Sequence, residues 1–141
     1  MNDPKRYILI ATGTGVTPYR SMLQEIKQRL NNPAQNLKVN LILGVREEAE
    51  LLFKDQFLQF AKEEPNFEFY ACYSRAENKP LESFERKGYV QTVFEELTLD
   101  PLNDIVYLCG NPNMIDETFA LLTERGFDRK SVRREKYLFS H

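Results

Sequence analysis

The chain has 141 residues, with 19 lysines and arginines against 21 aspartates and glutamates, so its formal net charge is −2. This length predicts one domain, and a charge near zero gives no general attraction to nucleic acid or to an anionic membrane surface. Cys72 and Cys109 lack metal-ligand or disulfide-framework spacing, and no apolar stretch approaches the roughly 18 residues of a membrane span, so we expect a cytoplasmic protein without a metal site.

Apolar runs of strand length alternate with amphipathic stretches along the whole chain. This alternation, without repeats or low-complexity linkers, is typical of an α/β domain with a parallel sheet. We therefore predict an open parallel sheet of five strands that is flanked by helices. The strands are expected at residues 6–11, 38–43, 67–73, 104–109 and 135–139.

Between the first two strands, apolar residues recur at steps of three and four, which predicts a helix with one face on the sheet. Thr17 is the expected N-cap, and Pro18 suits the first turn because its missing N–H would have no helical partner there. The residues expected to face inward are Tyr19, Met22, Leu23, Ile26 and Leu30.

Three further helices are predicted by the same periodicity. The apolar residues that define them are Phe53, Phe57, Phe60 and Ala61, then Val93, Phe94 and Leu97, and finally Ile115, Phe119 and Leu122. The last helix is expected at residues 113–125, with Asn111 as N-cap, Pro112 in the first turn and Gly126 as its C-terminal stop.

The corner after the first strand reads ATGTGVTPYRS, residues 11–21. Gly13 and Gly15 permit a positive φ and a close backbone approach, and a helix start offers N–H groups to a phosphate. The sequence matches neither GxGxxG nor the P-loop pattern, so a plain strand-to-helix turn is an equally good interpretation of this stretch alone. In open parallel sheets, however, ligands bind at this edge.

A second corner, VYLCGNPNM at residues 106–114, repeats the same arrangement of strand, glycine and capped helix. The two corners are therefore expected to form opposite walls of one crevice. Two interpretations of Cys109 remain open at this point: a buried thiol at a strand end, or a soft sulfur that contacts a flat ring.

Six segments together resemble the ferredoxin-NADP+ reductases and their flavoprotein relatives, and the resemblance extends from Ile8 to Tyr137. In chain order they are GTGVTPYRS, LILGVREEAELLF, CYSR, KGYVQ, CGNPNM and REKY. The resemblance implies a Rossmann-like domain that binds a pyridine nucleotide in this crevice.

The resemblance also implies roles for both corners. Thr14, between Gly13 and Gly15, would approach the nicotinamide and pyrophosphate, since a hydroxyl can hydrogen-bond a carboxamide or phosphate oxygen. Cys109 and Gly110 would lie beside the nicotinamide, with Cys109 in a catalytic position. The same wall would be shaped by Pro112 and Met114, although Met114 also suits a core-filling role.

Cofactor choice depends on the segment after the third strand, YSRAENK, which has no carboxylate directly at the strand end. A 2′-phosphate needs cations and hydroxyl donors, whereas an NAD site presents a carboxylate to the ribose. The family pattern implies NADP(H) and the binding residues Arg46, Ser74, Arg75, Lys87, Tyr89 and Gln91, with Tyr89 stacked on the adenine. The alternative is that the charges around Arg75 and Lys87 form only a solvated loop.

Near the C-terminus, Tyr137 matches the aromatic residue that covers the flavin in the family, and Glu135 matches the carboxylate two residues before it. Glu135 would relay a proton or close the site. The chain departs from the plant-type pattern by continuing to His141, and a tyrosine in an edge strand is also common in cores and interfaces. Arg129, Lys130 and their basic neighbours would dock an acidic carrier or form a solvated surface.

The resemblance implies that the complete enzyme transfers hydride between NADPH and FAD and passes electrons to a ferredoxin or flavodoxin-type carrier. Residues 1–141 would form the NAD(P)-binding domain, and the FAD-binding barrel domain is absent, so we expect this chain alone to be inactive. Two alternatives are an NADH-specific reductase component of an oxygenase and a stand-alone nucleotide-binding module without redox chemistry.

Overall fold

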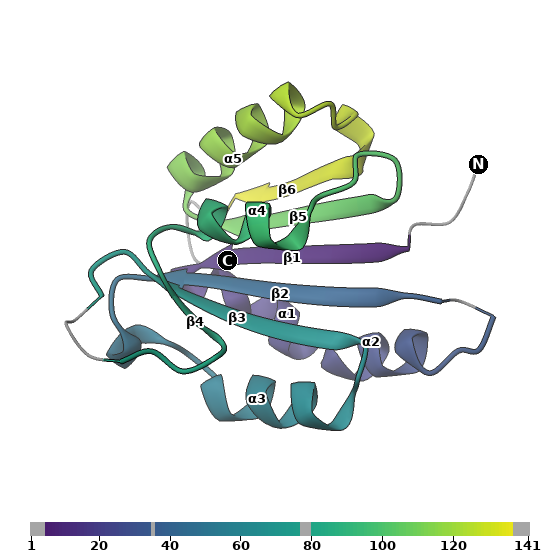
Figure 1. Cartoon of the computed structure of the whole chain (residues 1–141), viewed down its shortest axis with the longest axis horizontal. Helices are drawn as coiled ribbons and strands as arrows, with labels where there is room; N and C mark the ends of the chain where they lie inside the picture. The colour runs from purple at the N-terminus through teal and green to yellow at the C-terminus, as the bar shows by residue number, and fades with distance from the viewer. Residues whose placement is uncertain (1–4, 35, 77–79, 137–141) are drawn as a thin grey trace.

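The computed structural model describes residues 5–34, 36–76 and 80–136. They form an open sheet of six parallel strands in the order β4-β3-β2-β1-β5-β6 (Figure 1). The strands are β1 (Arg6–Thr12), β2 (Lys38–Val45), β3 (Phe67–Tyr73), β4 (Glu85–Lys87), β5 (Asp104–Gly110) and β6 (Val132–Lys136). The order reverses at β1, which has β2 on one side and β5 on the other.

The predicted α/β fold with a parallel sheet is confirmed, but the predicted number of strands is wrong. The sixth strand, β4, is only Glu-Arg-Lys, so it carries no apolar run that would reveal it. The last strand begins at Val132, three residues before the predicted start, and predicted positions 137–139 lie outside the described residues. The early start is explained by Val132, which is buried against α5 and its neighbours.

Two apolar layers hold the sheet between helices. Alternate residues of each strand point to opposite faces, so Leu9 packs in one layer while Ile8 and Ile10 pack in the other. The first layer is covered by α1 (Thr17–Ser21), α2 (Leu23–Leu30) and α3 (Lys54–Glu63), and the second by α4 (Val93–Leu97) and α5 (Pro112–Glu124) (Figure 1). This arrangement leaves the carboxyl edge of the strands for ligand binding.

The first predicted helix is two helices that meet at Met22. The expectation that Thr17 is its N-cap is wrong. A 3-10 turn, η1 (Gly13–Val16), leads directly into α1, so Val16 occupies the cap position and Thr17 is already helical. Among the residues that the structure describes, no side chain caps this start, while Pro18 lies in the first turn as predicted.

The other predicted helices are confirmed, and α5 has the expected ends. The Asn111 side chain accepts hydrogen bonds from the backbone N–H groups of Asn113, at 2.8 Å, and Met114, at 3.3 Å. Gly126 ends the helix region with a φ of +97°, which a glycine adopts without strain. Within the described ranges, no helix has the length and apolarity to cross a bilayer, and no group of three or more potential metal ligands occurs.

Replacing Asn111 with alanine is expected to lower the free energy of unfolding by about 1 kcal/mol, because two N–H groups of α5 lose their acceptor. Chemical denaturation of both proteins measures this difference. Asn113→Ala is the control, since Asn113 contributes its backbone and not its side chain to the cap. Equal losses for both variants would contradict the capping role.

Candidate functional site

A cavity of about 830 Å³ lies at the carboxyl edge of the sheet, where the strand order reverses. Its lining comes from the ends of β1, β2, β3 and β5, from residues 88–91 after β4, and from the start of α5. We call this cavity the crevice. Its position agrees with the general placement of ligands in open parallel sheets.

The two glycine corners meet at the base of the crevice. A Cβ on Gly15 would lie 2.7 Å from the Cys109 carbonyl oxygen, and a Cβ on Gly110 would lie 2.7 Å from the Thr12 oxygen atoms. The Thr12 hydroxyl accepts a hydrogen bond from the backbone N–H of Asn111 at 3.0 Å. The corners are therefore in direct contact, and not opposite walls as expected from the sequence.

Most predicted residues of these corners line the crevice: Gly13, Gly15, Gly110, Pro112 and Met114. The side chain of Thr14 lies outside the described part of the chain. The two helix starts differ in what they offer to an anion. The Asn111 side chain already accepts from two amides of α5, whereas Val16, at the cap position of α1, makes no such hydrogen bond.

The structure favours the buried-thiol interpretation of Cys109. Its exposed fraction is 2%, its side chain packs in the layer under α1–α3, and it is not among the crevice-lining residues. In the β5–β6 pairing, Glu135 is the register partner of Cys109. The Glu135 side chain and all of Tyr137 lie outside what the structure describes.

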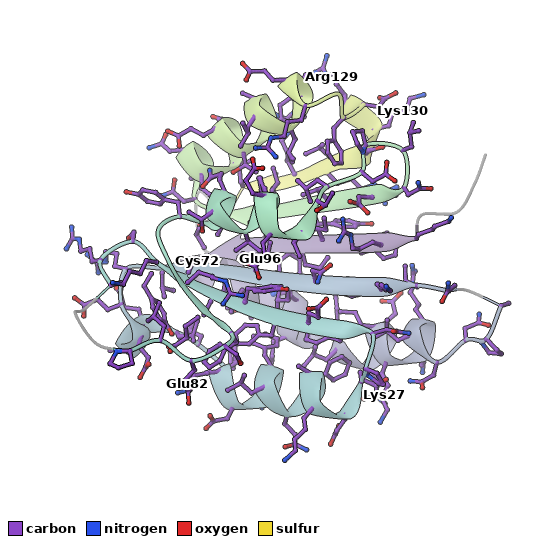
Figure 2. The ribbon with its side chains drawn as sticks, in the orientation of Figure 1. Lys27, Cys72, Glu82, Glu96, Arg129 and Lys130 are labelled. Carbon is purple, nitrogen blue, oxygen red and sulfur yellow. The ribbon has the colours of Figure 1, made fainter. Side chains whose placement is uncertain are left out.

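Cys72, which the sequence did not mark as a site residue, lines the crevice at the end of β3. Figure 2 shows it with Glu96 on the side of the sheet that carries α4. Burial raises the pKa of its thiol to about 12, so it stays protonated at neutral pH and is a poor nucleophile. Its place directly before Tyr73 and Ser74 in the CYSR segment was the available signal.

The ends of β2 and β3 are joined beside the crevice. The Ser74 N–H donates to the Val45 carbonyl at 3.0 Å, and the Arg75 N–H donates to the Arg46 carbonyl at 2.9 Å. Ser74 and Arg46 both line the crevice. These two predicted residues are thus brought together by the backbone.

Tyr89 and Gln91 line the crevice on the segment after β4. The Tyr89 side chain is 71% exposed, so its ring is open to a partner, as a stacking platform requires. The Gln91 amide donates to the buried Thr118 hydroxyl of α5 at 3.0 Å. Gln91 is therefore held by α5, the helix whose start lines the crevice.

Arg46 is paired with a carboxylate that the sequence analysis missed. Glu50 lies in the turn η2 (Glu48–Glu50), lines the crevice, and accepts from Arg46 Nη2 at 2.5 Å and from Nε at 3.1 Å. Their hydrogen bonding raises the pKa of Arg46 and lowers that of Glu50, so both remain charged at neutral pH. The spacing of four residues from Arg46 was the signal in the sequence.

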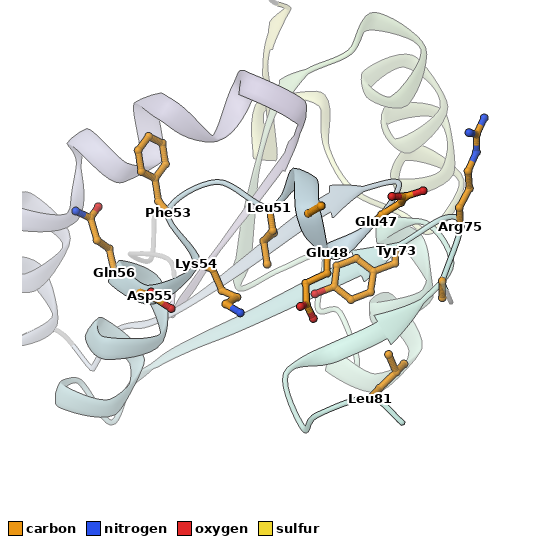
Figure 3. A pocket seen from close by; sticks show the side chains of 12 residues that line it. Glu47, Glu48, Leu51, Phe53, Lys54, Asp55, Gln56, Tyr73, Arg75 and Leu81 are labelled. Atoms are coloured by element: carbon orange, nitrogen blue, oxygen red, sulfur yellow. The ribbon is translucent and has the colours of Figure 1, made fainter. Parts of the chain in front are cut away.

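Two predicted cations do not line the crevice. Arg75 lines a second cavity of about 600 Å³ between the end of β3, η2 and the start of α3. Figure 3 shows the Arg75 side chain extending away from Glu48 and Tyr73 in that cavity. Lys87 is the exposed last residue of β4. Each is a sequence neighbour of a residue that lines the crevice: Arg75 follows Ser74, and Lys87 precedes Gly88.

Of the basic residues near β6 whose side chains the structure describes, none lines the crevice. Arg129 and Lys130 belong to the turn η4 (Arg129–Ser131) before β6, at the edge of the sheet away from the crevice (Figure 2). Arg133 stacks on Tyr107 with its guanidinium carbon 5.3 Å from the ring centre, and Arg134 stacks on Phe119 at 3.9 Å. These contacts support a structural role for the latter pair.

Residues 9–119 match the family described as the oxidoreductase NAD-binding domain. The chain belongs to this family, within the ferredoxin reductases. The open sheet and its reversal point agree with this membership. The predicted resemblance is therefore confirmed.

The similar proteins include three kinds of oxidoreductase component. The domain is 29% identical over 133 residues to the toluate 1,2-dioxygenase electron transfer component of Pseudomonas putida, covering 94% of this chain and 37% of the relative. It is 35% identical over 139 residues to a ferredoxin-NADP reductase of Picosynechococcus, covering 90% and 34%. It is 30% identical over 133 residues to NADH-cytochrome b5 reductase 1 of Dictyostelium discoideum, covering 93% and 44%.

The domain thus spans between a third and a half of the length of these relatives. A solved structure of a ferredoxin NADP+ reductase from Neisseria gonorrhoeae, with bound FAD and NADP, has the same fold with a TM-score of 0.76. It is 26% identical, and the match covers 95% of this chain and 56% of that one. The domain is accordingly an NAD(P)-binding domain of a family of oxidoreductases.

Proposed function

We propose that this domain binds NADPH in the crevice as part of a flavin-dependent oxidoreductase. In the complete enzyme, hydride passes between NADPH and FAD, and electrons go on to a ferredoxin or flavodoxin-type carrier. The observation that carries the proposal is the position of the crevice at the carboxyl edge of the sheet, beside the reversal of strand order at β1 and lined by both glycine corners. Gly13 lines it with a positive φ and with no heavy atom within 4 Å of its would-be Cβ, so its backbone is open to a flat ring or a pyrophosphate.

The residues present fit a dinucleotide. When bound, the nicotinamide ring supplies the hydride chemistry, and the protein supplies orientation. The backbone at Gly13–Gly15 precedes the uncapped start of α1 and is proposed to face the pyrophosphate. Tyr89, with its exposed ring, is proposed to stack on the adenine, and Ser74 to donate to the phosphate on the ribose.

We further propose that a FAD-binding domain completes the crevice. Glu135 is the register partner of Cys109, so the C-terminal strand brings this segment beside the second corner. Glu135 and Tyr137 are proposed to lie toward the flavin, as the family pattern implies. Cys109 would then act through its backbone, because its sulfur is buried in the core.

Replacing Arg75 with alanine is expected to weaken binding of 2′-phospho-AMP by about tenfold to a hundredfold, which corresponds to roughly 1.5 to 3 kcal/mol for a lost charge-assisted hydrogen bond. Binding of AMP should stay nearly unchanged. Calorimetric titration of the domain with both ligands measures the two affinities. The effect requires that Arg75 turns from its present direction toward the ligand.

Lys54→Ala is the matched control, since Lys54 is a cation of the second cavity and does not line the crevice. It should leave both affinities unchanged. If the unaltered domain binds the two ligands equally well, the proposed NADPH preference is wrong. Failure to bind either one at millimolar concentration would contradict a nucleotide site in the crevice.

An NADH-dependent reductase component of an oxygenase is the second candidate, and one observation favours it. Glu50 places a carboxylate in the crevice, which is the group that NAD sites present to ribose hydroxyls. After reconstitution with a flavin domain, the rates at which NADH and NADPH reduce the flavin distinguish the two. A stand-alone nucleotide module would show no electron transfer in the same assay.

A further inference from the structure

We propose that Glu50 determines how strongly the crevice distinguishes NADPH from NADH, by holding Arg46 in an ion pair. This inference rests on the proposed nucleotide-binding function of the crevice. It makes the Glu50 carboxylate the group that sets the relative affinity of the crevice for a ribose with a 2′-phosphate and for a ribose without one.

The geometry shows how completely Glu50 engages Arg46. One carboxylate oxygen accepts from Nη2 at 2.5 Å, and the other accepts from Nε and from the backbone N–H of Arg46, both at 3.1 Å. The side edge of the guanidinium is therefore fully used, and its remaining N–H groups are on Nη1 and Nη2. A phosphate that binds Arg46 has to displace Glu50, or it has to accept hydrogen bonds from the Nη1 and Nη2 N–H groups that Glu50 does not use.

The charges that line the crevice show which groups take part in this competition. Among the lining residues that the structure describes, Arg46 is the cation, and Glu50 and Glu117 are the carboxylates. The 2′-phosphate carries about −1.5 to −2 charges at neutral pH, so Glu50 repels it and also competes for Arg46. An unphosphorylated ribose has hydroxyl groups that can donate to the same carboxylate.

The position of Glu50 is fixed by the fold. Its turn η2 begins three residues after the last residue of β2, and the Glu50 N–H donates to the Glu47 carbonyl at 3.0 Å. The next strand end, at Ser74 and Arg75, is bonded to the carbonyls of Val45 and Arg46. The pair therefore lies beside Ser74, the hydroxyl that the phosphate is proposed to contact.

Glu50→Gln is the test, because glutamine keeps the shape of the side chain and removes its charge. We expect 2′-phospho-AMP to bind about threefold to tenfold more tightly, while AMP binds equally or more weakly. The gain should shrink as salt is raised, since the groups are exposed and therefore screened. Calorimetric titration with both ligands at low and moderate salt measures this.

The matched control is Glu48→Gln, the same change two residues earlier in η2, on a side chain that lines the second cavity and is not among the groups that shift the pKa of Arg46. It should leave the ratio of the two affinities unchanged. In an Arg46→Gln background, the gain from Glu50→Gln should fall to less than half, because the pair no longer exists. A gain of the same size there would overturn the role of the ion pair.

The outcomes separate this inference from the function on which it rests. If the unaltered domain binds 2′-phospho-AMP and Glu50→Gln leaves the ratio unchanged or lowers it, the inference is overturned while the nucleotide site stands. If the unaltered domain binds neither ligand, the proposed function is overturned and the inference falls with it. If Glu50→Gln raises the ratio of the affinity for 2′-phospho-AMP to that for AMP, and the control variant does not, the result supports the inference and the proposed function.

Discussion

An alanine at Gly110 is expected to lower the free energy of unfolding by about 2 to 5 kcal/mol, the sum of backbone strain and overpacking. Gly110 has a φ of +124°, and its Cβ would lie 2.7 Å from the backbone oxygen of Thr12 and from its Oγ1. Both obstacles are fixed parts of β1, so the corner itself has to shift. Chemical denaturation followed by circular dichroism measures the loss.

Gly13→Ala is the informative comparison. Gly13 also has a positive φ, of +56°, but no heavy atom lies within 4 Å of its would-be Cβ. Only the left-handed backbone opposes the substitution, so we expect a loss of about 1 to 2 kcal/mol. If Gly13→Ala costs as much as Gly110→Ala, close packing of the two corners is not what excludes a side chain at Gly110.

Asp104→Ala is expected to destabilise the domain by about 3 to 5 kcal/mol, because it leaves the Arg6 guanidinium without its buried partner. The Asp104 side chain is 3% exposed and accepts from Arg6 Nη2 at 2.6 Å and from Nε at 3.0 Å. It also accepts from the Asp100 N–H at 2.8 Å. Thermal or urea unfolding measures the loss.

The contrasting pair is Arg29 and Glu25, whose side chains are 50% and 57% exposed. Glu25→Ala removes the same kind of bond, 3.2 Å long, from solvent. It should change the stability by no more than about 0.5 kcal/mol. A comparable loss in both variants would show that burial does not explain the contribution of Asp104.

Most strands of the sheet could be predicted because each contains a run of apolar residues that is recognisable in the sequence. A strand buried on both faces needs a continuous apolar run, as in Ile8–Ala11 and Leu41–Leu43, and such runs are visible in the sequence. β4 was missed because three edge residues with two cations need no such run. Thr17 was misassigned as a cap because the turn η1 adds helical geometry before it, which the cap pattern does not show.

The parts of the candidate site that the backbone forms could be predicted from the sequence. The positions of its long side chains could be predicted less well. Gly15 and Gly110 follow from their places at strand ends. The direction of a long side chain does not: Arg75 was expected in the crevice but lines the second cavity, while its neighbour Ser74 lines the crevice. Glu50 was missed because it is not at a strand end: it lies in η2, four residues after Arg46, and its carboxylate accepts from the Arg46 guanidinium.

The central pairing of β1 with β5 has a consequence for the order of folding. Arg6 and Asp104, which pair at one end of these strands, are 98 positions apart, so their meeting closes most of the chain into a loop. Such distant contacts form slowly, because the entropy of loop closure is lost before the contacts are gained. β1, β2 and β3 are close in sequence and can assemble beforehand, but they supply only half of the crevice base. The nucleotide that we propose for the crevice would therefore stabilise the chain only after this loop has closed.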